Sequence, residues 1–254
     1  MNGSVFAQPT ASRVTIAGDI SYLYMGAIPR TVESPTEGYE QDGTFSPVDI
    51  AGRIAFASKI FKNILIGGSV QRLQSRIGFN EVTKERINDR IAQSIAIDLG
   101  FIYDTPYIKG LSIAGCLQNL GNQTRAFFEE EEPMPSSINF GVAYKKILHR
   151  KQKIKSDSQE SPTQPADINP NIITVAMDVS FPADNSPNIR IGGEYTFANG
   201  ISIRSGYRTG TGFDFPSGLC GGLGYDSNEY RVDYAFVPYG SLGNTHRVSL
   251  TVRF

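Results

Sequence analysis

The last nine residues of the chain, His246 to Phe254, constrain the fold more than any other segment. Val248, Leu250, Val252 and Phe254 alternate there with polar or charged side chains. Successive side chains of a strand point to opposite faces, so this segment predicts a strand with one apolar and one polar face. The sequence then ends on an aromatic residue, as the closing strand of a membrane β-barrel does.

The same period of two recurs along the whole sequence, and helical spacing of apolar residues does not. Twelve strands are predicted, over residues 13–24, 48–56, 63–75, 91–103, 110–120, 137–145, 173–181, 189–197, 201–208, 219–225, 230–236 and 246–254. Residues 4–8 are expected to be the stub of a further strand. Asn199-Gly200, the strongest short hairpin signal, separates two of the predicted strands.

The predicted connections alternate in length. Those on one side span residues 29–44, 76–90, 121–136, 182–188, 209–217 and 237–245. Those on the other side span 60–63, 104–109, 146–171, 198–200 and 226–229, and all but one of these are short. Outer-membrane barrels have short periplasmic turns and longer outer loops. The sequence therefore predicts a transmembrane antiparallel up-and-down β-barrel, a single domain over residues 1–254 with a polar, basic insertion at 146–171.

Composition narrows the class of protein. No apolar run approaches the roughly 18 residues that a transmembrane helix needs, which excludes a helical membrane protein. The 24 basic residues balance 25 acidic ones, so no nucleic-acid partner is indicated. Gly, Tyr and Phe are frequent, as expected of short strands and interfacial aromatics, whereas the lack of Trp counts against a barrel. Cys116 and Cys220 are interpreted as two small core residues and not as a disulfide.

Periodicity does not distinguish the inside of a barrel from its outside. A soluble barrel would enclose the apolar faces, whereas a membrane barrel exposes them to lipid and lines its lumen with charge. Apolar, aromatic-rich faces on a dozen strands exceed what a closed soluble barrel can hold, so we expect the membrane form. The alternative is a soluble lipocalin-like binder. The charges predicted for the lumen include Asp178, Arg190, Glu194, Arg204, Arg231 and Asp233. We expect cross-strand ion pairs there, with substrate contacts as the alternative.

Several segments resemble motifs of one family, and they occur in the family's order from about residue 12 to 254. The segments are Leu111–Gly115, Gln118–Gly121, Met134–Tyr144, Ile191–Thr196, Arg204–Arg208, Asp233–Pro238 and Leu242–Leu250. Together they resemble the PorV/PorQ-like outer-membrane barrels of the FadL (long-chain fatty acid transporter) superfamily. An uncharacterised branch of that superfamily has the most similar pattern.

The resemblance implies a 14-stranded barrel with an N-terminal hatch inside the lumen. It also implies a signal peptide and an Asn-Pro-Ala segment near the N-terminus. Residues 1–8 have no basic region and no apolar stretch of about 7 to 15 residues, so they are not a secretory signal. We therefore expect that this sequence lacks the first part of the family's pattern. The expected location is the outer membrane of a diderm bacterium.

The resemblance implies passive uptake of hydrophobic small molecules such as long-chain fatty acids. The alternatives are a PorV-like secretion or assembly component that binds periplasmic or secreted proteins, and a truncated remnant without function. The expected partners are outer-membrane lipid and the barrel assembly machinery. Val248, Leu250, Val252 and Phe254 are the predicted membrane insertion signal.

Three segments outside the strands are candidate sites. Phe127 and Phe128 are candidates for an apolar lid over a ligand mouth, and Glu129–Glu132 is either a solvated acidic loop or a divalent-cation contact. The insertion at 146–171 is either a solvated loop or a docking segment for a periplasmic partner. His149 and His246 have neither metal-ligand spacing nor a nucleophile partner. The sequence therefore predicts no catalytic residues, no metal, no cofactor and no enzymatic activity.

Overall fold

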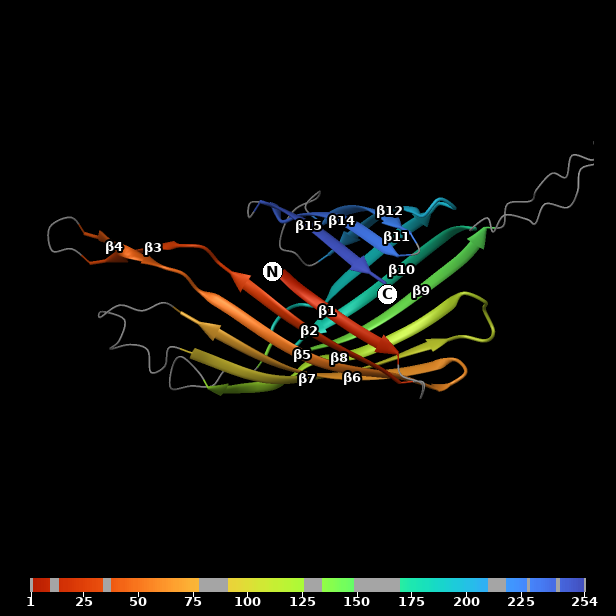
Figure 1. Ribbon diagram of the computed structural model, residues 1–254, viewed down its shortest axis with the longest axis horizontal. Coiled ribbons are helices and arrows are strands. Elements are labelled where there is room, and N and C mark those ends of the chain that lie inside the picture. The colour runs from red at the N-terminus through yellow and green to blue at the C-terminus, as the bar shows by residue number, and fades with distance from the viewer. Residues whose placement is uncertain are drawn as a thin grey trace, which may run out of the picture. The chain divides into compact units, whose positions relative to one another are not determined.

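The fold is built almost entirely from strands, as shown by a computed structural model (Figure 1). It describes residues 2–9, 14–33, 38–77, 91–125, 134–148, 170–209, 218–227, 229–240 and 243–253. The strands are β1 (Asn2–Pro9), β2 (Val14–Tyr24), β3 (Ile28–Val32), β4 (Glu40–Phe45), β5 (Val48–Phe61), β6 (Ile64–Arg76), β7 (Ile91–Asp104), β8 (Leu111–Arg125), β9 (Ser137–Leu148), β10 (Asn171–Pro182), β11 (Asn188–Thr196), β12 (Ile201–Arg208), β13 (Leu219–Asp226), β14 (Tyr230–Pro238) and β15 (Asn244–Val252). Within these ranges, no helix is long and apolar enough to cross a membrane.

Thirteen strands form one sheet in the order β1-β2-β5-β6-β7-β8-β9-β10-β11-β12-β13-β14-β15. Neighbouring strands of this sheet are also consecutive in the sequence, except that β3 and β4 lie between β2 and β5. The strand pairs with a described register are antiparallel. The twelve predicted strands are therefore confirmed, and the predicted stub is the eight-residue strand β1.

The hairpin of β3 and β4 was not predicted, because residues 29–44 were interpreted as a loop. These two strands pair only with each other, in a two-stranded sheet whose register shifts between Pro29 and Thr31. Neither strand alternates apolar with polar residues, so the period-two signal is missing. The backbone N–H of Met25 donates to the Pro47 carbonyl at 3.2 Å and closes the base of this excursion.

Connection lengths follow the predicted parity. One side has the connections 62–63, 105–110, 149–170, 197–200 and 227–229. The other has 25–47, 77–90, 126–136, 183–187, 209–218 and 239–243. The connections at 126–136, 183–187 and 239–243 are shorter than predicted, because the strands that flank them are longer than predicted and β8, β10 and β14 run on to Arg125, Pro182 and Pro238. We refer below to the two sides as the inner and the outer side, as the alternation of short and long connections predicts.

Exposure is reversed relative to a soluble protein. Many large apolar side chains of the strands are exposed, among them Ile54 at 71% and Val248 at 75%. The buried side chains are small or polar, such as Ala96 at 1% and Gln71 at 9%. Soluble proteins bury their large aliphatic residues, whereas a membrane barrel presents them to lipid. The sheet therefore has the apolar outward face and polar inner face of a transmembrane β-barrel, as predicted, and not those of a soluble binder.

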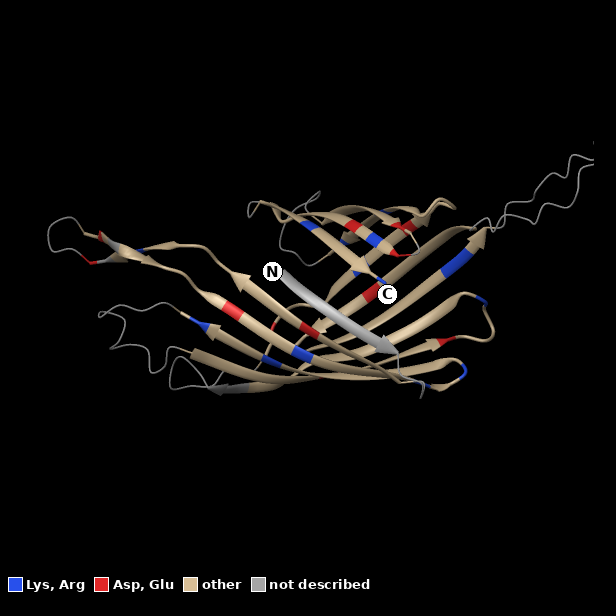
Figure 2. Ribbon diagram, in the orientation of Figure 1, with Lys and Arg blue, Asp and Glu red and all other residues tan. Residues whose placement is uncertain are grey.

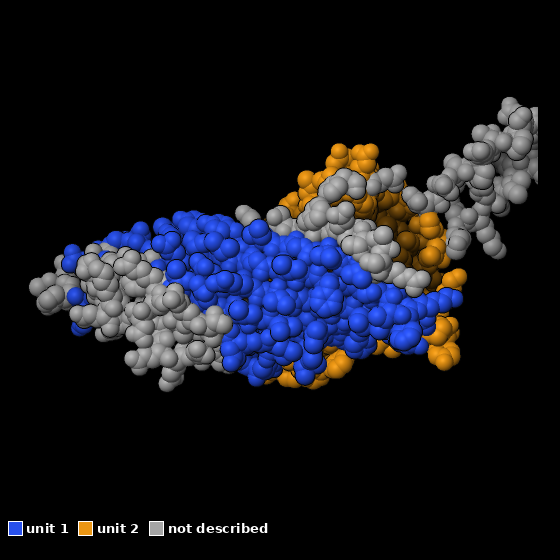
Figure 3. Space-filling view, turned by 60° about the horizontal axis from the view of Figure 1, so that its bottom comes forward, with its two compact units in different colours: residues 1–103, 115–138, 182–184 blue, residues 104–114, 139–181, 185–254 orange. Residues whose placement is uncertain are grey.

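The chain divides into two compact units (Figure 3). Unit 1 contains Met1–Tyr103, Gly115–Ile138 and Pro182–Asp184, and unit 2 contains Asp104–Ala114, Asn139–Phe181 and Asn185–Phe254. Charged residues are spread along the strands of both units among mostly uncharged neighbours (Figure 2). We call the side opposite the exposed apolar side chains the lumen face, and both candidate sites described below lie on it.

Candidate functional site

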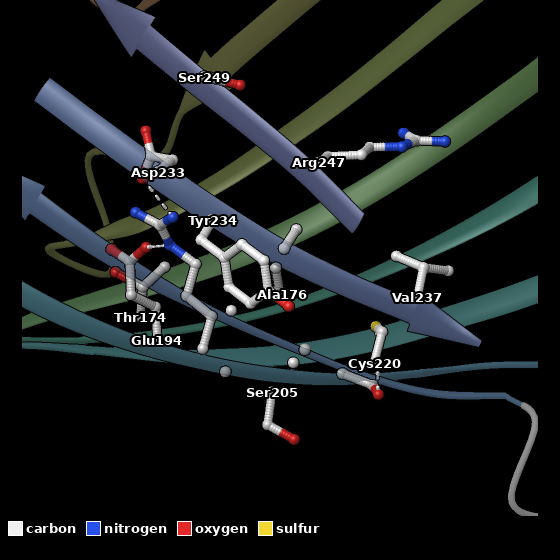
Figure 4. A pocket seen from close by; sticks show the side chains of 17 residues that line it. Thr174, Ala176, Glu194, Ser205, Cys220, Asp233, Tyr234, Val237, Arg247 and Ser249 are labelled. Carbon is white, nitrogen blue, oxygen red and sulfur yellow. Dashed lines mark hydrogen bonds and ion pairs between the residues drawn. The ribbon is translucent and has the colours of Figure 1, made fainter. Parts of the chain in front are cut away.

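Ion pairs join four strands on the lumen face of unit 2. Arg204 on β12 donates to Glu194, its Cα partner on β11, and binds Asp233 Oδ1 on β14 at 2.5 Å (Figure 4). This second contact crosses β13 above Gly224. A Cβ at Gly224 would lie 2.7 Å from Asp233 Oδ1 and 3.0 Å from Arg204 Nη2, so a side chain there would displace the ends of both charged groups.

The ion pairs continue to the inner side of the strands. Arg231 Nε binds Asp233 Oδ2 at 2.7 Å. Arg253, which follows β15, donates to Asp226 through both terminal guanidinium nitrogens, Nη1 and Nη2, at 2.7 and 3.0 Å. Hydrogen bonding to Asp226 raises the pKa of the Arg253 guanidinium above its ordinary value. The last strand is thus tied to the β13–β14 turn by a bidentate ion pair, the stronger geometry for arginine and carboxylate.

A hollow of about 440 Å³ adjoins this network on the lumen face (Figure 4). Glu194 and Asp233 lie at one end of it, and Cys220 and Val237 lie at the other. Its floor consists of small residues at lumen positions of successive strands, namely Ala176, Gly192, Gly206, Cys220, Gly222 and Ala235. The small residues open a space between charged neighbours, and that space is lined mainly by carbon.

A second hollow of about 500 Å³ overlaps the first and extends toward the outer side. The two share Ala176, Gly192, Gly206 and three other residues. Asp178, Arg190, Arg208 and Arg247 also line the second one. The sequence predicted Asp178 and Arg190 for the lumen, but it did not single out Arg208 and Arg247 as candidates. The alternation placed both residues on the polar face, but it did not show that they line the same hollow.

Unit 1 has a separate polar network on its lumen face. Arg53 on β5 approaches Asp19 on β2 at 3.7 Å and donates to Gln71 on β6 at 2.8 Å. Gln71 in turn donates to the Asn119 side chain on β8 at 2.6 Å. Asp98 on β7 accepts from the Asn119 backbone N–H at 2.8 Å. The network therefore crosses five strands through one ion pair and three hydrogen bonds, and each of these hydrogen bonds has at least one uncharged partner.

Asn119 is the irregular position in this network. Its φ is +56°, a left-handed conformation that asparagine adopts more readily than most residues. The alternation of β8 changes phase there, because Ile113 and Leu120 are both exposed although one is odd-numbered and the other even-numbered. One extra residue in a strand has this effect. The three-residue step from Leu117 to Leu120 could have revealed it in the sequence.

The predicted site residues fall into four groups. Glu194, Arg204 and Asp233 form cross-strand ion pairs, as expected, whereas Arg231 pairs with Asp233 on its own strand and approaches Asp226 on β13 at 3.7 Å. His246 accepts or donates a 2.8 Å hydrogen bond with the Tyr234 hydroxyl, and the described ranges hold no cluster of metal-ligating side chains. Val248, Leu250 and Val252 are exposed on β15. The residues outside the described ranges are Phe127, Phe128, Glu129–Glu132, His149, Phe254 and residues 149–169 of the insertion.

Comparison with known proteins supports the fold. No family model and no curated protein matches the sequence. The toluene transporter TodX of Pseudomonas putida matches over 92% of this chain and 75% of its own, with 11% identity and a TM-score of 0.50. The chain has an outer-membrane β-barrel fold. CdiB from Acinetobacter baumannii matches over 94% of this chain, with 9% identity and a TM-score of 0.48, and the match spans about half (47%) of CdiB. The similarity to TodX therefore confirms the outer-membrane β-barrel fold, whereas membership of the FadL superfamily and the PorV-like features stay predictions.

Proposed function

We propose that this barrel is a passive conduit for hydrophobic small molecules, such as long-chain fatty acids, across the outer membrane. The observation that carries the proposal is the hollow of about 440 Å³ on the lumen face of unit 2. A lumen face lined by charge alone would offer an apolar molecule no contact. Here Ala176, Gly192 and Gly206 occupy lumen positions without charged side chains, so part of the lumen face is apolar.

The size of the hollow also suits a small molecule. Ligand sites in proteins commonly enclose about 300 to 1,000 Å³ and combine apolar walls with a few polar groups. The hollow of this barrel has that composition, because its small-residue floor is bounded by Glu194, Arg204 and Asp233. The fold that the chain shares with TodX, a toluene transporter, supports the same proposal.

The test is uptake of radiolabelled oleate by cells of a diderm host that lacks its own fatty-acid channel. Whole cells are needed because their lipopolysaccharide leaflet is a barrier that phospholipid vesicles lack. The chain is expressed behind the host's export signal. Ala176→Phe fills the hollow from the lumen face, and Val175→Phe adds the same ring on the exposed apolar face one residue away.

We expect the wild-type chain and Val175→Phe to support uptake, and Ala176→Phe to lower the rate at least fivefold at equal barrel abundance. Equal uptake by Ala176→Phe and wild type would show that the hollow is not the path. If the wild-type chain gives no more uptake than the empty host, the transport proposal is wrong. The secretion alternative would then be tested by deleting residues 149–169 and measuring secreted or periplasmic proteins retained by the barrel.

A further inference from the structure

Three arginines on the lumen face of unit 2 surround one hollow. Arg190 on β11, Arg208 on β12 and Arg247 on β15 all line the hollow of about 500 Å³. Among the described residues that line it, Asp178 is the single acidic one. Three positive charges and one negative charge leave this lining with a net charge of +2.

The register of the sheet places two of these charges against each other. Arg190 and Arg208 are directly opposite Cα partners in the β11–β12 pair. Like charges directly opposite each other in a sheet destabilise it. Asp178 is the Cα partner of Arg190 on the other side, yet the ion pairs found among the described residues do not include it or any of the three arginines.

Arg208 is oriented by an aromatic ring. Its guanidinium carbon lies 5.3 Å from the centroid of the Tyr239 ring, within the range of a cation–π contact. Among the described residues, no ion pair engages this guanidinium. A ring contact of this kind therefore holds the cation in place without neutralising it.

The inner network of the same unit has the opposite character. Arg204, Arg231 and Arg253 are each within 4 Å of a carboxylate, and the acidic partners are Glu194, Asp226 and Asp233. Three positive charges there meet three negative ones. The excess charge is therefore specific to the outer hollow, where a bound anion would relieve the repulsion between Arg190 and Arg208.

We infer that the outer hollow binds an organic dianion, a phosphate monoester with an apolar body. Guanidinium groups bind phosphate oxygens in pairs, and a phosphate monoester carries close to two negative charges at pH 7, which matches the net charge of the lining. The small residues shared by both hollows, such as Ala176 and Gly206, would contact the apolar body. This inference rests on the proposed function, because a ligand in the lumen presupposes a route to it.

The test uses three probes with one ring system: 1-naphthyl phosphate, 1-naphthoate and 1-naphthol, which carry a dianionic, a monoanionic and a neutral group at pH 7.5. The purified full chain, in zwitterionic detergent, is titrated with each probe, and partition into empty micelles is subtracted. We expect 1-naphthyl phosphate to bind at least tenfold more tightly than 1-naphthoate, and 1-naphthol more weakly still. Equal affinity for the three probes would overturn the inference without the use of any variant.

A matched pair of variants locates the site. Arg208→Gln should weaken binding of 1-naphthyl phosphate about tenfold. Arg72→Gln removes the same charge from the apolar side of β6, where Arg72 is exposed and donates to Gln93, and should change the affinity less than twofold. Equal losses in the two variants would refute the site. Binding in detergent needs no transport, so a failure of oleate uptake and a failure of dianion binding are separate results.

Discussion

The assignment of the apolar face to lipid can be tested with two adjacent residues of β10. Val175 is 49% exposed on the apolar face, whereas Ala176 lines the hollow on the lumen face. Val175 is the fifth of the twelve residues of β10. At about 3.4 Å per residue and a strand tilt of about 40°, it lies roughly 4 Å from the middle of the strand along the membrane normal.

Arginine at that depth on the lipid side costs about 2–4 kcal/mol. Val175→Arg should therefore lower the free energy of unfolding by at least about 2 kcal/mol, a factor of roughly 30 in the unfolding equilibrium. Ala176→Arg is closer still to the middle of the strand but faces the lumen, where water and space are available. Its cost should stay below about 1 kcal/mol, mainly from repulsion by Arg247, which lines the same hollow.

The measurement is urea unfolding of the chain folded into phosphatidylcholine vesicles. The sequence contains no Trp, so unfolding is followed by far-ultraviolet circular dichroism and by the gel mobility of the unboiled protein. Each variant is compared with the wild type in the same vesicles. Equal destabilisation by the two variants, or a larger effect of Ala176→Arg, would refute the assignment of the two faces.

Two further changes test the lumen networks in the same assay. Arg204→Ala leaves Glu194 and Asp233 without their shared partner and should lower the free energy of unfolding by about 1–2 kcal/mol. This is less than for a buried pair, because these side chains are about one-quarter to one-third exposed. In 1 M salt the loss should be smaller, and an unchanged loss would argue against an electrostatic cause. Asn119→Val places a branched residue at φ +56° and removes the hydrogen bond with Gln71, so it should lower the free energy of unfolding by about 2 kcal/mol or more. Asn119→Gly should cost less, because glycine adopts this φ freely. The reverse order of the two variants would contradict the argument from backbone conformation.

The strands could be predicted from the sequence because the same physical signal repeats in each of them. Lipid on one face and polar surroundings on the other impose a period of two on each strand. The connections lie outside this environment and lack the period, so the strands stand out from them. The ends of β5 and β8 were the least accurate, because these strands run on to Phe61 and Arg125 although residues 57–61 and 121–125 do not alternate apolar with polar residues. Smaller misses occurred at the ends of β10 and β14, where Pro182 and Pro238 still lie within the strands although proline resembles a loop signal.

The lumen sites were only partly predictable. Alternation places Arg204, Asp233 and Arg208 on one face, but it does not say which side chains meet across intervening strands. The Arg204–Asp233 contact passes over Gly224, a residue that has no side chain to signal the contact in the sequence. The gathering of Arg190, Arg208 and Arg247 depends on register, which a single strand does not contain.

The closed base of the β3–β4 hairpin separates the hairpin from the main sheet, so the two are under different evolutionary constraints. Tyr24 pairs with Val48 in the main sheet, and the Met25–Pro47 hydrogen bond joins the chain immediately beyond that pair. The register of β2 with β5 is therefore set without the hairpin, which pairs only with itself. Residues 26–46 can vary in length and sequence while the sheet persists. We therefore expect this position to tolerate an inserted epitope or binding peptide without loss of the main sheet.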